Sequence, residues 1–243
     1  MTTVPDQTSI ALKRVVVDVP VDHDPARPPR RLLGPLDLLL DEQRVTVIGA
    51  NGSGKSTLLR LLNGLVLPTS GDVVVDGHNT RSDGPAVRRR VAFAFTDPLS
   101  QLVMPTGRED VELSLRRVHR DRTTRRQAAE EALTRLGLLP LADQSIHDLS
   151  GGERQLMALA AVLATGPRVL VLDEPSTLLD LHNTMLLRRT LAGLSQTIVM
   201  ATHDLDLALD AERTLVVDAG AVVFDGAPRD AVAHYRALHL GAP

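Results

Sequence analysis

Short apolar runs alternate with amphipathic segments along most of the chain. The apolar runs are rich in β-branched residues and bounded by turn residues, a pattern typical of strands. The run Arg44–Ile48 in particular fits a fully buried strand of a parallel sheet. They lie at Arg14–Val19, Arg44–Ile48, Val73–Val75, Val91–Phe95, Val169–Leu172, Thr197–Ala201, Leu215–Val217 and Val222–Phe224. Segments with helical spacing are Leu58–Leu62, Leu181–Leu194 and Leu205–Leu209. This alternation of strands and helices predicts an α/β core.

The middle of the chain, from about residue 106 to residue 164, has a different pattern. Gly107–Arg117 and Thr124–Leu136 carry helical spacing with no strand between them. Thr123 or Thr124 is expected to cap the second helix, and Gly137 to follow its last turn. The pattern therefore predicts a helical insert within the α/β core.

Composition restricts the chemistry that this chain can perform. Of 243 residues, 43% are hydrophobic and 23% charged, which is typical of a globular protein. A net charge of −3 and an aromatic content of 2% argue against a nucleic-acid binder, which needs a basic face or stacking side chains. The absence of cysteine excludes disulfides and thiolate chemistry. No charge-free apolar stretch approaches the roughly 20 residues of a membrane-spanning helix.

A glycine-rich segment between a predicted strand and a predicted helix matches the pattern G-x-x-x-x-G-K-[ST]. It consists of Gly49, Ala50, Asn51, Gly52, Ser53, Gly54, Lys55, Ser56 and Thr57. The glycines allow backbone N–H groups to approach phosphate oxygens, and the start of the following helix adds positive potential. Lys55 is expected to contact the β- and γ-phosphates, and the Ser56 hydroxyl to bind Mg²⁺. Of the basic residues, 25 are arginine and only two are lysine. One of the two lysines is Lys55, at a position where the planar guanidinium of arginine would not fit the centre of the loop.

Polar residues also follow two of the predicted strands. Asp173 and Glu174 end the run Val169–Leu172, where Asp173 is expected to hold Mg²⁺ and Glu174 to act as general base toward water. His203 follows the next strand and is expected to stabilise charge on the γ-phosphate. A carboxylate at a strand end can instead cap a helix, and a histidine at a strand end can simply be a surface residue. The catalytic interpretation of Asp173, Glu174 and His203 therefore depends on the presence of the phosphate loop.

A second small-residue segment, Ser150, Gly151 and Gly152, stands at the start of a predicted helix. Such an N-terminus suits an anion. By itself, the segment is equally consistent with a simple turn that begins a helix.

Taken together, GANGSGKST, LSGGE, VLVLDEP, STLLD and ATHD occur in the order and spacing of ATP-binding-cassette (ABC) ATPases. The chain resembles this family over nearly its whole length. The resemblance implies the α/β fold of a P-loop NTPase, namely an ABC nucleotide-binding domain with an antiparallel β subdomain and an inserted α-helical subdomain. One domain would span residues 1–243, with 1–95 and 166–243 forming the core and β subdomain and about 106–165 forming the helical subdomain.

The resemblance also implies ATP and Mg²⁺ as cofactors and a head-to-tail pair of cassettes, either a homodimer or a dimer with a close paralogue. Ser150, Gly151 and Gly152 would then contact the γ-phosphate of ATP bound to the partner cassette. Asp180, at the end of STLLD, would link the two sites across the dimer.

The sequence departs from the family pattern at two places. Thr96 stands after the strand Val91–Phe95, where the family usually has a glutamine that touches Mg²⁺ and the attacking water. A threonine offers a hydroxyl but is shorter, and Gln101 is expected to belong to a partner-facing surface instead. Val19 occupies the position of the usual adenine-stacking aromatic, with His23 as the alternative adenine contact.

The stretch Asp97–Thr106 resembles the partner-docking region of energy-coupling-factor (ECF) importers, and Asp173–Asn183 is similar to their biotin and cobalt/nickel branch. This resemblance implies an ATP-hydrolysing motor at the cytoplasmic face of the membrane, bound to a membrane coupling subunit, with a separate membrane subunit for the cargo. Two alternatives stay open, namely a soluble ATPase of iron–sulfur cofactor assembly and a slow ATP-dependent dimerisation clamp. Arg88–Arg90 and Arg116–Arg126 are interpreted either as solvated faces or as contacts for acidic loops or headgroups.

Overall fold

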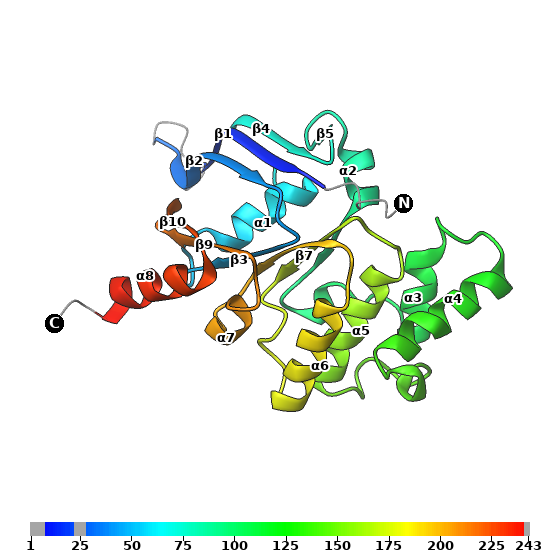
Figure 1. Ribbon diagram of the computed structural model, residues 1–243. Helices are drawn as coiled ribbons and strands as arrows, with labels where there is room; N and C mark the ends of the chain where they lie inside the picture. Colours follow the sequence, from blue (N-terminus) through cyan, green and yellow to red (C-terminus); the bar gives the residue numbers. More distant parts are fainter. Residues whose placement is uncertain (1–7, 22–27, 241–243) are drawn as a thin grey trace, which may run out of the picture.

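The computed structural model describes residues 8–21 and 28–240, which form two sheets and a layer of helices (Figure 1). The larger sheet has six strands in the order β10-β9-β3-β8-β7-β6. These strands are β3 (Arg44–Ile48), β6 (Val91–Ala94), β7 (Val169–Asp173), β8 (Thr197–Ala201), β9 (Arg213–Asp218) and β10 (Ala221–Gly226). All neighbours pair in parallel except β9 and β10, which form an antiparallel hairpin. The parallel pairing expected for Arg44–Ile48 is confirmed, because β3 is parallel to both β8 and β9.

The smaller sheet is antiparallel, with the order β2-β1-β4-β5. Its strands are β1 (Ile10–Val19), β2 (Arg30–Leu40), β4 (Ser70–Val75) and β5 (His78–Asn79). The sequence pattern does not reveal β2, because a Gly-Pro pair interrupts it and its leucines do not alternate cleanly with polar residues. Gly34 is required there, since a Cβ at this position would lie 2.1 Å from the Val15 carbonyl oxygen.

Eight α-helices and two short 3₁₀ helices complete the part of the chain that the structure describes. The α-helices are α1 (Lys55–Asn63), α2 (Gly84–Arg90), α3 (Gly107–Leu115), α4 (Arg122–Arg135), α5 (Gly151–Leu163), α6 (Leu181–Ala192), α7 (Leu205–Ala208) and α8 (Pro228–Leu240). The 3₁₀ helices are η1 (Pro98–Ser100) and η2 (Leu139–Leu141). Helices α2 and α8 are not evident from the sequence pattern.

The start of α4 corrects one prediction. Asp121, and neither Thr123 nor Thr124, caps this helix, because its carboxylate accepts a hydrogen bond from the Thr124 N–H at 2.7 Å. The helix therefore begins two or three residues earlier than the threonine caps would place it.

Helix α1 lies between the two sheets and has buried leucines on most of its circumference. It shares a hydrophobic cluster with residues of both sheets, among them Val45 and Val199 of the large sheet. Alternate residues of the same strands, such as Ile198 and Met200, face a second cluster that contains residues of α3 to α6. Figure 1 shows these helices gathered on one side of the molecule. Within residues 8–21 and 28–240, no helix has both the length and the apolar character needed to cross a membrane.

Candidate nucleotide site

The glycine-rich loop connects the end of β3 to α1, as its sequence predicts. Gly49, Gly52 and Gly54 all have positive φ, at 155°, 77° and 116°. A Cβ at Gly49 would lie 2.1 Å from the Val217 carbonyl oxygen, so the loop passes closer to β9 than any side chain would allow. Glycine is therefore needed for both backbone conformation and close packing.

The N-terminus of α1 has backbone N–H groups without a hydrogen-bond acceptor among the described residues. Its N-cap is Gly54, which supplies no side-chain hydrogen bond. In the described part of the chain, no hydrogen bond uses the N–H groups of Lys55, Ser56 or Thr57. By contrast, α3, α4, α5, α6 and α7 all have side-chain caps. An uncapped helix start with a glycine-lined approach is a site for an anion.

Lys55 is buried beneath this loop, with 6% of its side chain exposed. Its Nζ donates to the carbonyl oxygens of Gly49 at 2.8 Å and Ala50 at 3.2 Å, and lies 3.6 Å from Glu174 Oε1. The only other lysine, Lys13, lies on β1. A single ammonium group is therefore held among the loop carbonyls, within reach of a phosphate on the loop.

Glu174 and His203 meet at the carboxyl ends of β7 and β8. Glu174 Oε2 lies 2.7 Å from His203 Nδ1 and accepts the His203 backbone N–H at 3.1 Å. Its other oxygen faces Lys55, so the carboxylate lies between a lysine and a histidine. The two residues are 29 positions apart, but Asp173 and Ala201 are paired in neighbouring strands. The strand order therefore produces a contact that motif spacing alone does not reveal.

Asp173 and Ser56 form the second polar pair of the site. The Ser56 hydroxyl donates to Asp173 Oδ1 at 2.9 Å. Burial raises the pKa of Asp173, and the hydrogen bond from Ser56 opposes this shift. A hydroxyl and a carboxylate at this distance are the hard oxygen donors that suit Mg²⁺.

Thr96 lies two residues beyond β6 at the same edge of the sheet, because Ala94 pairs with Leu172. It makes no hydrogen bond to the described side chains of the site. Gln101 forms two internal hydrogen bonds. Its side chain is turned inward, accepting from the Phe95 N–H at 3.4 Å and donating to the Ala158 carbonyl at 2.7 Å. Gln101 therefore ties the end of β6 to α5, and its side chain remains partly exposed.

The segment Ser150–Gly152 begins α5. The Ser150 hydroxyl accepts the Glu153 N–H, and Glu153 accepts the Ser150 N–H at 2.7 Å, which is a capping box. This leaves the Gly151 and Gly152 N–H groups without a hydrogen bond among the described residues. No hydrogen bond joins the segment to the glycine-rich loop of the same chain, as far as the chain is described. Asp180 caps α6 by accepting the Asn183 N–H at 2.8 Å.

One supporting element was not anticipated from the sequence. The turn between β9 and β10 lies against the loop, where the Gly220 N–H donates to the Ser53 carbonyl at 2.8 Å. The Gly220 carbonyl in turn accepts from Gly34 of β2 at 2.8 Å. The Asp218–Gly220 turn sequence signals a hairpin, but its contact with the loop depends on the packing of the two sheets. His23 lies outside the described residues.

Comparison with known proteins identifies the family. A family model described as ABC transporter matches residues 37–177. The biotin transport ATP-binding protein BioM of Rhizobium etli is 43% identical, over 86% of this chain and 93% of the relative. The energy-coupling factor transporter ATP-binding protein EcfA1 of Halalkalibacterium halodurans is 40% identical, over 76% of this chain and 68% of the relative.

Two solved structures share the fold. The ATP-binding cassette MJ0796, solved as a dimer in a post-hydrolysis state with ADP and Pi, has a TM-score of 0.80 and 29% identity, covering 90% of this chain and 99% of the other. The cbiO1 protein of Clostridium perfringens, described as part of the ABC transporter complex cbiONQ, has a TM-score of 0.78 and 28% identity, covering 95% of each chain. This chain therefore belongs to the ABC transporter family as an ATP-hydrolysing cassette similar to the ATPases of ECF and biotin transporters.

Proposed function

We propose that this chain is the motor subunit of an ECF-type importer that carries a vitamin, with biotin favoured and cobalt or nickel as the alternative cargo. The observation that carries the motor role is the Glu174 carboxylate held between Lys55 and His203 beside the uncapped start of α1. The names of the BioM and EcfA1 relatives support the importer class and biotin. The likeness to cbiO1 supports the alternative cargo.

ATP hydrolysis follows from the donors and acceptors of the site. The free N–H groups of the loop and of α1 bind the phosphates, and Lys55 exchanges loop carbonyls for β- and γ-phosphate oxygens. Water attacks the γ-phosphorus while Glu174 accepts its proton, and the bond from this phosphorus to the bridging oxygen breaks to release ADP. His203 orients the Glu174 carboxylate through Nδ1 and stabilises charge on the γ-phosphate.

Ser56 and Asp173 are the proposed Mg²⁺ ligands, and the Thr96 hydroxyl is a third candidate at the same sheet edge. The Ser56–Asp173 pair fits this role because both donors are oxygens and already lie together. When bound, Mg²⁺ would neutralise charge on the β- and γ-phosphates.

We also propose that the active form is a head-to-tail dimer with an identical or closely related cassette. The free N–H groups of Gly151 and Gly152 support this, because among the described residues they make no hydrogen bond, either to the glycine-rich loop of their own chain or elsewhere. Ser150, Gly151 and Gly152 would contact the γ-phosphate held by the partner, and Asp180 would connect the two sites. Residues 106–165 would act as the helical subdomain that presents this segment.

The membrane coupling subunit is proposed to dock where the helical part meets the core. A groove of about 290 Å³ there is lined by Leu65, Arg88, Arg89 and Phe95 among others. Beyond Phe95, the segment Asp97–Thr106 exposes Leu99 at 45% and Val103 at 69%. The groove thus combines apolar surface with two arginines suited to acidic loops. Docking would place the chain at the cytoplasmic face of the membrane, with the cargo bound by a separate membrane subunit.

Co-expression with each coupling subunit of the same genome tests this proposal, and a detergent-stable complex is the expected result. Leu99→Asp with Val103→Asp should abolish recovery of the complex, because they place charge on the exposed apolar segment. Leu39→Asp is the matched control, since Leu39 is similarly exposed on β2, outside the docking surface. Failure with every coupling subunit, or equal loss with the control, would contradict the assignment.

A further inference from the structure

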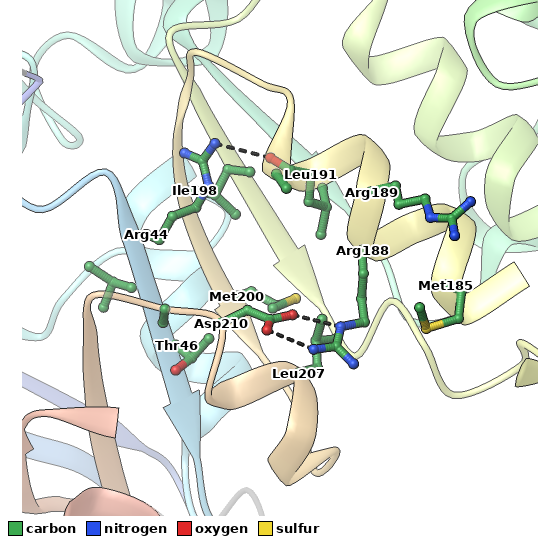
Figure 2. A pocket seen from close by; sticks show the side chains of 13 residues that line it. Arg44, Thr46, Met185, Arg188, Arg189, Leu191, Ile198, Met200, Leu207 and Asp210 are labelled. Atoms are coloured by element: carbon green, nitrogen blue, oxygen red, sulfur yellow. Dashed lines mark hydrogen bonds and ion pairs between the residues drawn. The ribbon is translucent and has the colours of Figure 1, made fainter. Parts of the chain in front are cut away.

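The helices that cover one face of the large sheet leave a gap. Helix α7 has only four residues and therefore covers little of strands β3 and β8. Between α7 and α6 lies a cavity of about 470 Å³, open to solvent and seen from close by in Figure 2. This volume falls within the roughly 300–1,000 Å³ of small-molecule sites.

The cavity has an apolar floor and wall. Ile198 and Met200 of β8, Leu191 of α6 and Leu207 of α7 supply buried aliphatic and thioether surface. Met185, 40% exposed, lies on the same side, so a ligand would cover an apolar side chain that now faces water. Such a lining suits a hydrocarbon body and offers few hydrogen bonds to a polar one.

The charged residues that line the cavity are mostly arginines. Arg44, Arg188 and Arg189 line it together with a single carboxylate, Asp210. Arg188 joins α6 to the segment after α7 through two hydrogen bonds to Asp210, at 2.6 and 2.7 Å (Figure 2). Arg189 makes no ion pair with the described residues. One ion pair thus spans the opening and two further arginines line the cavity, while Asp204 and Asp206 add negative charge near Arg188.

Arg44 adds a charge that no carboxylate contacts. Its two terminal nitrogens donate to the carbonyls of Gln43, Gln196, Leu191 and Leu194, and no described residue accepts from its Nε. Burial lowers the pKa of Arg44, and Glu212 acts on it only through the longer-range field. A bound anion would neutralise the charge of the Arg44 guanidinium, whose hydrogen bonds within the protein are made to carbonyl oxygens alone.

We propose that this cavity binds a small amphipathic anion, a carboxylate on a hydrocarbon chain, with the chain on Ile198, Met200 and Leu207 and the carboxylate among the arginines. The cavity lies toward the amino end of β3, at Arg44–Thr46, whereas the phosphate loop begins after the other end of that strand. It is therefore separate from the nucleotide site.

Calorimetric titration of the full chain with sodium octanoate tests this proposal, with 1-octanol as the neutral control of equal chain length. Octanoate should bind saturably at one site, about tenfold more tightly than octanol, a ratio that corresponds to one charge-assisted contact. The titration is repeated with saturating ADP, and the affinity should be unchanged because ADP occupies the phosphate loop. Competition by ADP would place octanoate at the nucleotide site and overturn the proposal.

Two variants assign the bound octanoate to this cavity. Ala211→Phe, which fills the cavity from its edge, should weaken binding about tenfold or more, whereas Ala237→Phe on the exposed face of α8 should not. Arg188→Gln should weaken octanoate but not octanol. Equal affinities for octanoate and octanol would disprove an anion site. If neither octanoate nor octanol binds, and Met185 is protected from oxidation only in a complex with membrane subunits, the surface is a protein contact and the proposal is wrong.

Discussion

The backbone at Glu174 is unusual for a non-glycine residue, because its φ is +54°. This conformation costs about 1 kcal/mol or more and is maintained by the surroundings. The Glu174 N–H donates to the Ala201 carbonyl at 3.0 Å, and the carboxylate is held by Lys55 and His203. The backbone strain is thus located at the residue that is proposed to accept a proton from water. The carboxylate of this residue faces Lys55 of the phosphate loop.

Two glycines of the phosphate loop should respond differently to the same substitution. Gly49→Ala should destabilise the fold by about 3 kcal/mol or more and abolish ATP binding, because its Cβ would collide with the Val217 carbonyl. Gly52→Ala should cost only about 1 kcal/mol, since its Cβ would meet nothing within 4 Å and only the positive φ is unfavourable. Urea unfolding of both variants measures the difference. Equal losses would show that backbone conformation, and not the close approach to β9, explains the glycine at position 49.

At the scale of elements, α3 anchors the segment that is proposed to dock on the membrane subunit. Asp110 of α3 is buried, and its Oδ2 accepts the N–H groups of Val103 and Met104, both at 2.7 Å. Gln101 fixes the same segment to α5. Exposed apolar residues such as Val103 are therefore presented on a backbone that is tied at two points.

The titration of Asp110 gives a pH-dependent prediction. Burial raises its pKa above the ordinary 3.8, more than the two N–H bonds lower it. As the pH rises above about 4, the unfolded chain loses this proton first, so ionisation favours unfolding until the folded carboxyl also ionises. The stability of the wild type relative to Asp110→Asn should therefore fall across this window. Urea unfolding at several pH values measures it.

Asp143 provides the control with the opposite sign. The hydrogen bond from Arg108 lowers the pKa of Asp143 below 3.8, so its ionised form stabilises the folded state. The stability of the wild type relative to Asp143→Asn should consequently fall as the pH drops below about 4. A shared sign for the two aspartates would contradict the assignment for Asp110.

At the scale of the whole molecule, the nucleotide site is assembled from several elements. The loop before α1 is supported by the β9–β10 turn, and that turn is bonded to β2 of the smaller sheet. Glu174 and His203 come from the ends of β7 and β8. The complementary segment at α5 forms no hydrogen bond to this loop among the described residues. In the proposed dimer, the second cassette would supply that segment.

Glu174→Gln should separate ATP binding from hydrolysis. The variant should bind ATP, hydrolyse it about 10²- to 10⁴-fold more slowly, and convert from monomer to dimer when ATP is added. Steady-state turnover and sedimentation measure the two effects, and Glu131→Gln, an exposed residue of α4, is the control. If the wild type also dimerises without turnover, the chain is the slow clamp and not a motor.

The sequence by itself determined the buried strands and the glycine-rich loop, and it predicted site roles for Glu174, His203 and Ser150, because periodicity and motif spacing are local properties. It did not reveal β2, whose Gly-Pro pair hides a strand, or the inward tie made by Gln101. The contact between Glu174 and His203, the support of Ser53 by Gly220, and the cavity between α6 and α7 were decided by the tertiary structure. These features join residues distant in sequence, so strand order and the packing of the two sheets decide them.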